Sequence, residues 1–160
     1  MRQPATNAFE TWVKWKGGRQ AELHGCGAPP LPAGGTQWEG GSGRQWTAEE
    51  LLTGAVELSV MMAFLQRAER EGLCPLFYQS SAETRAVVEG DGTERVTDVI
   101  VRPRVGVQHE NEVSLVQFIF EQLPMQCHLG LMLKALPRIQ PIIEVWGEES
   151  LAPPSALVGT

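Results

Sequence analysis

The sequence lacks the features that mark several large classes of protein. Its 160 residues include 13 basic residues against 19 acidic ones, and the basic residues are scattered along the chain. Because nucleic-acid binding depends on phosphate neutralisation by Lys and Arg, the net charge of -6 argues against a nucleic-acid partner. The Gly-rich tract at 40–43 also lacks the GxxxxGK sequence of a phosphate-binding loop.

Long apolar runs and a cysteine framework are missing as well. The longest apolar-rich stretch, 56–65, is too short to span a bilayer and contains Glu57 and Ser59. Residues 1–7 lack the apolar segment of a secretory signal. The 3 cysteines have no regular spacing, so no disulfide framework is implied. These absences predict a protein of the reducing cytoplasm with no membrane partner.

The length and the 42% hydrophobic content predict a single globular domain spanning 1–160, with its core over about 8–147 and a loose tail over 148–160. Residues 8–16 alternate apolar and polar side chains, and a glycine pair separates them from a second extended run. This pattern predicts a β-hairpin. Residues 25–46 are rich in Gly and Pro and predict a long loop with at most one short strand.

The clearest predicted element is a helix from Thr47 to about position 71. Thr47 and Glu50 have the spacing of a capping box, and Gly72 is a C-terminal stop signal. Between positions 51 and 65 the apolar residues cover nearly the whole circumference, which predicts burial on all sides. Such a helix, roughly 35 Å long, is more than one small α+β layer can cover. We therefore expect a homodimer that buries both copies of the helix in a shared core.

A pair of strands is predicted at 73–88 and 99–107, on either side of a Gly-Asp-Gly turn. Cys74, just after the long helix, is predicted to be a core residue. Pro103 in the second strand predicts an edge position or a bulge. A last strand is predicted at 141–146.

Two further helices complete the predicted order. One runs over about 110–123, with an apolar stripe, and ends at Pro124; a shorter one lies between Cys127 and Pro137. The order is therefore strands, long helix, strand pair, two helices and strand. It favours an α+β fold over a parallel βαβ sheet.

This order, and three short segments within it, resemble the OsmC/Ohr family of thiol peroxidases over about residues 10–146. Gly17-Gly18-Arg19 is similar to the segment that supplies the family's active-site arginine. Residues 47–52 resemble the family's Pro-Glu-Glu/Gln-Leu start of the central helix, with Ala48 at the proline position. Residues 127–129 fall where the family has Cys-Pro-x-Ser, and only the cysteine matches. The resemblance implies antiparallel sheets around a long buried central helix in an intertwined homodimer.

The resemblance also implies a set of site residues. In this family a thiolate attacks an organic hydroperoxide and becomes a sulfenic acid, which a second cysteine converts to a disulfide. Carried over by position, the arginine that stabilises the thiolate is Arg19, the carboxylate that holds it is Glu49 and the resolving thiol is Cys127. The attacking position holds Ser59, whose hydroxyl is far less acidic than a thiol and has no sulfenic-type state.

Taken without the resemblance, the same residues have simpler interpretations. Ser59 in a helix usually donates to a carbonyl one turn earlier. Glu57 faces either a wet interface or a pocket, because a buried carboxylate needs a partner or a proton. Cys127 at a helix N-terminus is either a reactive thiol or a small buried side chain.

Two functions remain open at this stage. The first belongs to organic hydroperoxide detoxification and the oxidative stress response: a thiol-dependent hydroperoxide reductase (peroxidase), weak or lost because of Ser59, with Cys127 or Cys26 as its thiol and a dithiol as reductant. The second is a non-catalytic dimeric binding protein that takes a hydrophobic small molecule in the same interface pocket. The predicted lining of that pocket is Glu57, Met61, Met62 and Phe64. We expect no cofactor and no metal, because the His/Cys pairs at 24/26 and 127/128 lack zinc-site spacing.

Overall fold

The computed structural model describes residues 8–127, 129–130 and 136–147. The predicted tail at 148–160 and most of the third predicted helix lie outside these residues. The chain divides into an N-terminal unit, Met1–Leu52, and a C-terminal unit, Thr53–Thr160, and the long helix α1 begins in one and continues in the other. Among the helices within the described ranges, none is long and apolar enough to cross a membrane.

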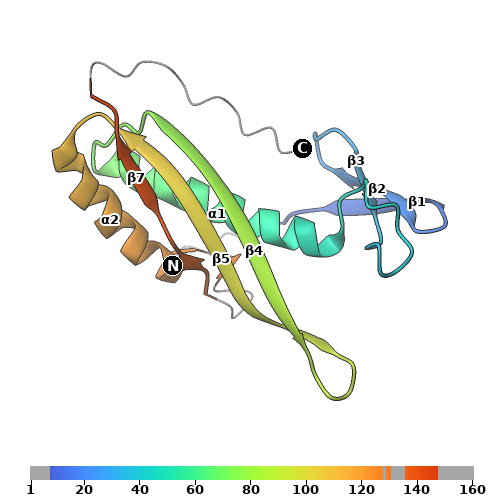
Figure 1. Ribbon diagram of the computed structural model, residues 1–160. Coiled ribbons are helices and arrows are strands. Elements are labelled where there is room, and N and C mark those ends of the chain that lie inside the picture. The colour runs from blue at the N-terminus through green and yellow to red at the C-terminus, as the bar shows by residue number, and fades with distance from the viewer. Residues whose placement is uncertain (1–7, 128, 131–135, 148–160) are drawn as a thin grey trace, which may run out of the picture. The chain divides into compact units, whose positions relative to one another are not determined.

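The N-terminal unit contains an antiparallel sheet of β1 (Thr11–Gly17), β2 (Gln20–Gly25) and β3 (Leu31–Gly34), in that order (Figure 1). The predicted hairpin is confirmed. Gly17 at the end of β1 and Gly18 in the turn have φ of 107° and 53°, values that a residue with a Cβ rarely adopts. The indole of Trp15 donates to the carbonyl of Gly18 across the turn at 3.0 Å. The predicted long loop follows β3.

Helix α1 spans Ala48–Arg70, close to the predicted range. The capping box is confirmed: the Glu50 amide donates to Thr47 Oγ1 at 3.2 Å, and the Thr47 amide donates to the Glu50 carboxylate at 2.9 Å. At the other end Gly72 has φ of 70°, and the Leu73 amide donates to the Ala68 carbonyl at 2.9 Å. This is a Schellman ending, which glycine permits.

Within the single chain, α1 is buried along one stripe rather than on all sides. The stripe recurs every four residues, as the helical period requires, and consists of Val56, Val60, Phe64 and Ala68. On other sides of the helix, Leu58 and Met62 are 56% and 57% exposed. Among the described residues, the sheet and the second helix cover one side of α1, and apolar side chains on its other sides stay exposed in the single chain.

The sheet of the C-terminal unit is mixed. Strands β4 (Phe77–Val88) and β5 (Glu94–Val107) pair antiparallel over most of their length (Figure 1). The short strands β6 (Arg138–Ile139) and β7 (Ile142–Val145) pair parallel with the other side of β5. The expected antiparallel pairing therefore holds for β1–β3 and for β4–β5. Strands β6 and β7 run parallel to β5 because a helical segment lies between β5 and β6 in the chain. A crossover connection of this kind joins parallel strands.

The prediction of an edge position or a bulge at Pro103 is wrong, because β5 is the central strand. Val101 pairs with Ile139 and Arg104 with Ile142, so residues 102–103 lie opposite the interruption between β6 and β7. The Val101 carbonyl accepts the Gln140 amide at 2.9 Å, and backbone groups two residues apart point to the same side. The missing N–H of Pro103 therefore faces the interruption, where no ladder bond is lost.

The second helical segment comprises a 3-10 turn at Glu110–Glu112, the helix α2 at Val113–Gln122 and a second 3-10 turn at Leu123–Met125. It packs on α1 through the stacked rings of Phe64 and Phe120, whose centroids are 4.6 Å apart. Both helices lie against one face of the sheet. The fully buried valines of that face are Val99, Val101, Val105 and Val107.

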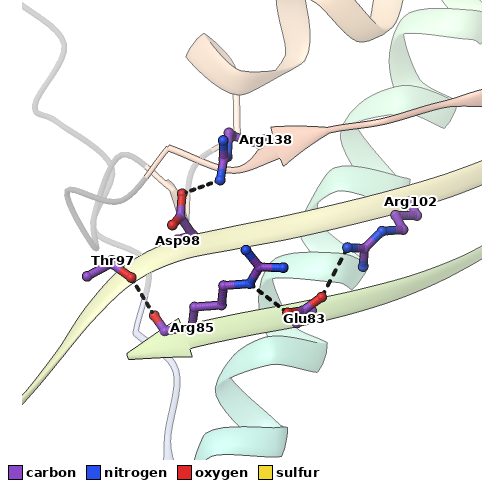
Figure 2. A network of polar contacts seen from close by, with 6 residues as sticks. All are labelled: Glu83, Arg85, Thr97, Asp98, Arg102 and Arg138. Carbon is purple, nitrogen blue, oxygen red and sulfur yellow. Dashed lines mark hydrogen bonds and ion pairs between the residues drawn. The ribbon is translucent and has the colours of Figure 1, made fainter. Parts of the chain in front are cut away.

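The opposite face of the sheet carries a network of charged residues, shown in Figure 2. Glu83 on β4 accepts from Arg85 Nε at 2.7 Å and from Arg102 Nη2 at 3.0 Å. Asp98 pairs with Arg138 on β6 at 2.8 Å. The two guanidinium groups hold the pKa of Glu83 below its usual range, chiefly through the bond from Arg85. The network joins three strands, although its exposure to water limits the stability that each pair adds.

Candidate functional site

Ser59 and Cys127 come together in the C-terminal unit, although they are far apart in the sequence. Ser59 is half-buried on α1, and Cys127 follows the 3-10 turn at Leu123–Met125 and is fully buried. The Cys127 thiol donates to Ser59 Oγ at 3.4 Å, an ordinary distance for a bond that involves sulfur. The Cys127 amide donates to the Leu123 carbonyl at 2.8 Å, which fixes the backbone that presents the thiol. The serine hydroxyl thus has a specific partner outside its own helix.

A hollow of about 320 Å³ adjoins Ser59. This volume is at the lower end of the range of small-molecule sites, roughly 300–1,000 Å³. The lining comes mostly from successive turns of α1, with one residue from the segment before Cys127. The lining residues are Ser59, Met62, Ala63, Gln66, Arg67, Arg70 and Gln126. The described lining thus combines apolar groups near Ser59 with two arginines and no acidic side chain.

Glu57 lies by a second, smaller hollow, of about 190 Å³, together with Met61 and Ser80. The Ser80 hydroxyl donates to Glu57 Oε1 at 2.5 Å, so the carboxylate has a partner on the sheet. Tyr78 lies two residues before Ser80 on β4. Burial raises the pKa of Tyr78 to about 12; the Ser80 hydroxyl opposes this shift, and the charge of Glu57 adds to it.

The predicted pocket residues are therefore divided within the single chain. Met62 lines the hollow at Ser59, whereas Glu57 and Met61 line the hollow at Ser80. Phe64 lies in the core, stacked on Phe120. A single pocket formed by all four predicted residues stays a prediction that concerns an assembly of two chains.

Arg19 occupies the end of the β1–β2 turn in the N-terminal unit, where its side chain is exposed and its carbonyl accepts the Gly35 amide at 3.0 Å. The carboxylate of Glu39, which sequence reasoning missed, interacts electrostatically with the guanidinium group of Arg19. Bonds from the amide and hydroxyl of Thr36, at 2.8 and 3.1 Å, lower the pKa of Glu39, and the charge of Arg19 lowers it further. The Thr-x-x-Glu spacing at 36–39 is the sequence signal for this local structure.

Glu49 is exposed in the first turn of α1 and belongs to the same unit as Arg19. Ser59 and Cys127 belong to the C-terminal unit. The meeting of all four residues in one site, with Arg19 between the carboxylate and the hydroxyl, stays a prediction.

The three cysteines are unpaired, and Cys26 and Cys74 are exposed. The prediction that Cys74 is a core residue is wrong. The helix ending at Gly72 turns Leu73 into the core, at 4% exposure, and leaves the next side chain in water. Within the described ranges, no three His, Cys, Asp or Glu residues are grouped as metal ligands would be; His128 lies outside those ranges.

No protein-family model and no curated protein sequence matches the chain. Solved structures do match it. An OsmC-like protein of unknown function from Vibrio cholerae has a TM-score of 0.73 at 15% identity, covering 86% of this chain and 99% of its own. An organic hydroperoxide resistance protein from Elizabethkingia anophelis has a TM-score of 0.65 at 10% identity, covering 90% and 100%. A third, from Legionella pneumophila, has a TM-score of 0.61 at 15% identity, covering 89% and 100%.

These likenesses define the class: the chain has the α+β fold of the OsmC-like and organic hydroperoxide resistance proteins. The fold expected from the order of elements is confirmed. The sequence identities of 10–15% show the fold and leave the chemistry of this chain to its own residues.

Proposed function

We propose that the chain is an OsmC/Ohr protein of organic hydroperoxide detoxification in which the two-cysteine reaction is weak or lost. The observation that carries this proposal is the contact between the Cys127 thiol and the Ser59 hydroxyl. In this proposal, Ser59 stands at the attacking position and Cys127 is the resolving thiol, so their contact would keep both positions of the reaction together while the nucleophile itself is missing. The shared fold with proteins named for organic hydroperoxide resistance supports the same proposal.

The chemistry explains why one atom decides the outcome. A thiolate at position 59 would attack the O–O bond and release an alcohol, leaving a sulfenic acid. The Cys127 thiolate would then attack that sulfur, form a disulfide and release water, and an external dithiol would reduce the disulfide. The Ser59 hydroxyl has neither the acidity nor the oxidation states for the first step. Arg19 would stabilise the thiolate and the departing alkoxide, and Glu49 would hold the guanidinium group of Arg19 in place.

Cys127 itself is a poor substitute for the missing nucleophile. Its side chain is fully buried in the core cluster, and a reactive thiol needs access to its substrate. Cys26 is exposed, but it lies in the N-terminal unit, in the loop that follows β2. We therefore expect only slow hydroperoxide turnover by the wild type.

The proposed assembly is a homodimer in the cytoplasm. Apolar side chains of α1 such as Leu58 are exposed in the single chain. Aromatic side chains of the N-terminal unit are exposed as well, and Trp15 is 74% exposed. We infer that an assembly covers part of these exposed apolar side chains. Free cysteines suit a reducing compartment.

A second candidate function, a binding protein for a hydrophobic small molecule, is favoured by the hollow beside Ser59. It keeps the site and needs no nucleophile. The two candidates differ in whether the site turns over a hydroperoxide once a thiol is supplied.

The test is turnover of cumene hydroperoxide with dithiothreitol by the wild type, Ser59→Cys, Cys127→Ala and the double variant. We expect a slow wild type and an increase of at least about a hundredfold in Ser59→Cys, which the added Cys127→Ala reduces. A fast wild type that Cys127→Ala abolishes would assign the reaction to Cys127. An inert Ser59→Cys whose thiol still reacts with a small alkylating reagent would favour the binding protein.

A further inference from the structure

The loop after β3 places a carboxylate, Glu39, beside the turn that carries Arg19. The Gly35 amide donates to the Arg19 carbonyl at 3.0 Å and so joins this loop to the turn. A Cβ at Gly35 would lie 3.1 Å from Glu39 Oε2 and 3.6 Å from Arg19 Cβ. Both side chains therefore adjoin the same glycine, which has no side chain of its own to separate them.

The local structure holds the Glu39 carboxylate in place. Its Oε2 accepts the Thr36 amide at 2.8 Å and the Thr36 hydroxyl at 3.1 Å. The Gly41 amide closes the loop by donating to the Thr36 carbonyl at 2.8 Å. A Cβ at Gly41 would lie 1.8 Å from the Gly35 carbonyl oxygen, so this tight loop requires glycine there. The carboxylate is thus oriented by its own loop before any cation meets it.

The charges of the two side chains interact. The bonds from Thr36 lower the pKa of Glu39, and the positive charge of Arg19 lowers it further, so the carboxylate is ionised at neutral pH. A guanidinium has several N–H donors in a planar fork and can therefore serve more than one anion. The side chain of Arg19 is exposed, and a fixed anion beside it reduces the rotamer freedom that a long exposed side chain otherwise has.

We propose that Glu39 is a positioning residue for Arg19 and acts alongside Glu49 to direct the guanidinium toward the attacking position of the site. The inference rests on the proposed function, because Arg19 has a reaction to serve only if it meets position 59 in the assembled protein. Glu39 touches neither the hydroperoxide nor the thiol. It acts by orienting the arginine that stabilises the thiolate and the departing alkoxide.

Positioning by Glu39 and a plain charge effect predict opposite results. A carboxylate that acts only as a charge near the site raises the pKa of a thiol there, because it repels the thiolate. Its removal would lower the thiol pKa. A carboxylate that positions Arg19 has the reverse effect: without it the guanidinium moves away, the thiolate loses its stabilising charge, and the thiol pKa rises. The sign of the change therefore identifies the role.

The experiment uses the full chain with Ser59→Cys, whose thiol stands at the attacking position. Alkylation of that thiol by iodoacetamide is followed by peptide mass spectrometry from about pH 5 to about pH 9, a range that includes the ordinary thiol pKa of about 8.5. Turnover of cumene hydroperoxide is measured alongside. We expect Glu39→Gln to slow the alkylation at about pH 6 by at least about threefold and to lower kcat/KM by at least about fivefold. Glu39→Asp, which keeps the charge, should recover part of both.

Further variants test whether Glu39 acts through Arg19. Arg19→Gln should cause a larger loss than Glu39→Gln, and adding Glu39→Gln to it should change nothing more. Thr36→Val removes one bond to the carboxylate and should cause an intermediate loss. The matched control is Glu22→Gln, which removes a carboxylate of the same unit that pairs with Lys16 at 3.0 Å. It should match the Ser59→Cys parent.

Unchanged or faster alkylation in Glu39→Gln would overturn the inference, and so would an equal further loss when Glu39→Gln is added to Arg19→Gln. The proposed function fails in other ways. If Arg19→Gln leaves both alkylation and turnover unchanged, Arg19 is not part of the site and Glu39 has no role there. If Ser59→Cys is inert toward the hydroperoxide but its alkylation still slows in Glu39→Gln, the peroxidase proposal is rejected and the positioning role stands.

Discussion

The two units of the chain differ in how far they bury their apolar side chains. Every fully buried residue that the structure describes lies in the C-terminal unit, whereas residues 8–52 of the N-terminal unit include none. Yet the N-terminal unit has four of the chain's 5 tryptophans, and Trp38 is 96% exposed. A three-stranded sheet needs an apolar face packed on something to be stable. The C-terminal unit therefore has its own core, and we propose that a second copy of the chain covers part of the apolar surface of the N-terminal unit.

The largest expected difference between the units is in side-chain truncation. Phe64→Ala removes a fully buried ring from the core and should lower the free energy of unfolding by about 3–5 kcal/mol. Phe9→Ala, in the N-terminal unit, removes a ring that is 91% exposed and should change it by no more than about 0.5 kcal/mol. Urea denaturation measures both. Equal losses would mean that Phe9 is covered as fully as Phe64.

The second prediction tests the cover itself. Leu58→Glu with Leu65→Glu places two charges on one exposed face of α1, where the side chains are 56% and 37% exposed in the single chain. If this face lies in a dimer interface, the dissociation constant should rise by at least about a hundredfold, because buried unpaired charges are costly.

Sedimentation equilibrium measures the change, and Gln117→Glu on the exposed side of α2 is the control. The helix content should stay the same in the far-ultraviolet circular dichroism spectrum. A folded wild-type monomer at micromolar concentration would contradict the dimer.

The local features of the fold could be predicted from the sequence because each depends on a few neighbouring residues. Thr47 and Glu50 specify the start of α1, and Gly72 specifies its end, through bonds that span no more than five residues. The all-round burial of α1 could not be predicted correctly for one chain. Periodicity shows which residues are apolar, but it does not show what covers them.

The site was less accessible to sequence reasoning. The resemblance placed Ser59 and Cys127 in one site, but their contact depends on how the segment after α2 packs against α1. The partner of Glu57, Ser80, is a half-buried serine on a strand, and no sequence pattern marks it. Glu39 has a Thr-x-x-Glu spacing, but this spacing lies in a Gly-rich segment with no predicted helix after it, so it does not by itself mark a site residue.

The third prediction concerns the interior of the C-terminal unit. Tyr78 is the chain's 1 tyrosine, so the absorbance of tyrosinate reports on this residue alone. Burial raises its pKa to about 12, whereas an unfolded tyrosine titrates near about 10. A group whose pKa is raised on folding stabilises the folded state at low pH, and this contribution is lost as the pH rises from about 10 to about 12.

We therefore expect a native titration midpoint close to 12 that falls to about 10 in denaturant. Tyr78→Phe should remove the titration and part of the alkaline destabilisation. A native midpoint near about 10 would show that water reaches the phenol.

The smallest effect is expected on the charged face of the sheet. Glu83→Gln should lower the urea midpoint slightly at neutral pH, because the exposed pairs with Arg85 and Arg102 are weak. The pKa of Glu83 is lowered on folding, so its contribution is present above the usual carboxyl pKa and is lost as the pH falls through the lowered value. The difference from the wild type should therefore vanish in acid. Glu121→Gln, an exposed residue of α2, is the control, and an equal deficit at both pH values would point to packing instead.

The pairing of position 59 with Cys127 is the central claim, and it is tested most directly by intact-protein mass spectrometry of Ser59→Cys after one equivalent of cumene hydroperoxide. The account predicts the loss of two hydrogens and a peptide pair cross-linked between positions 59 and 127, because the two side chains already touch at 3.4 Å. The wild type under the same conditions should show no such link. Oxidation of the new thiol to a sulfinic or sulfonic acid, with Cys127 still free, would contradict the account.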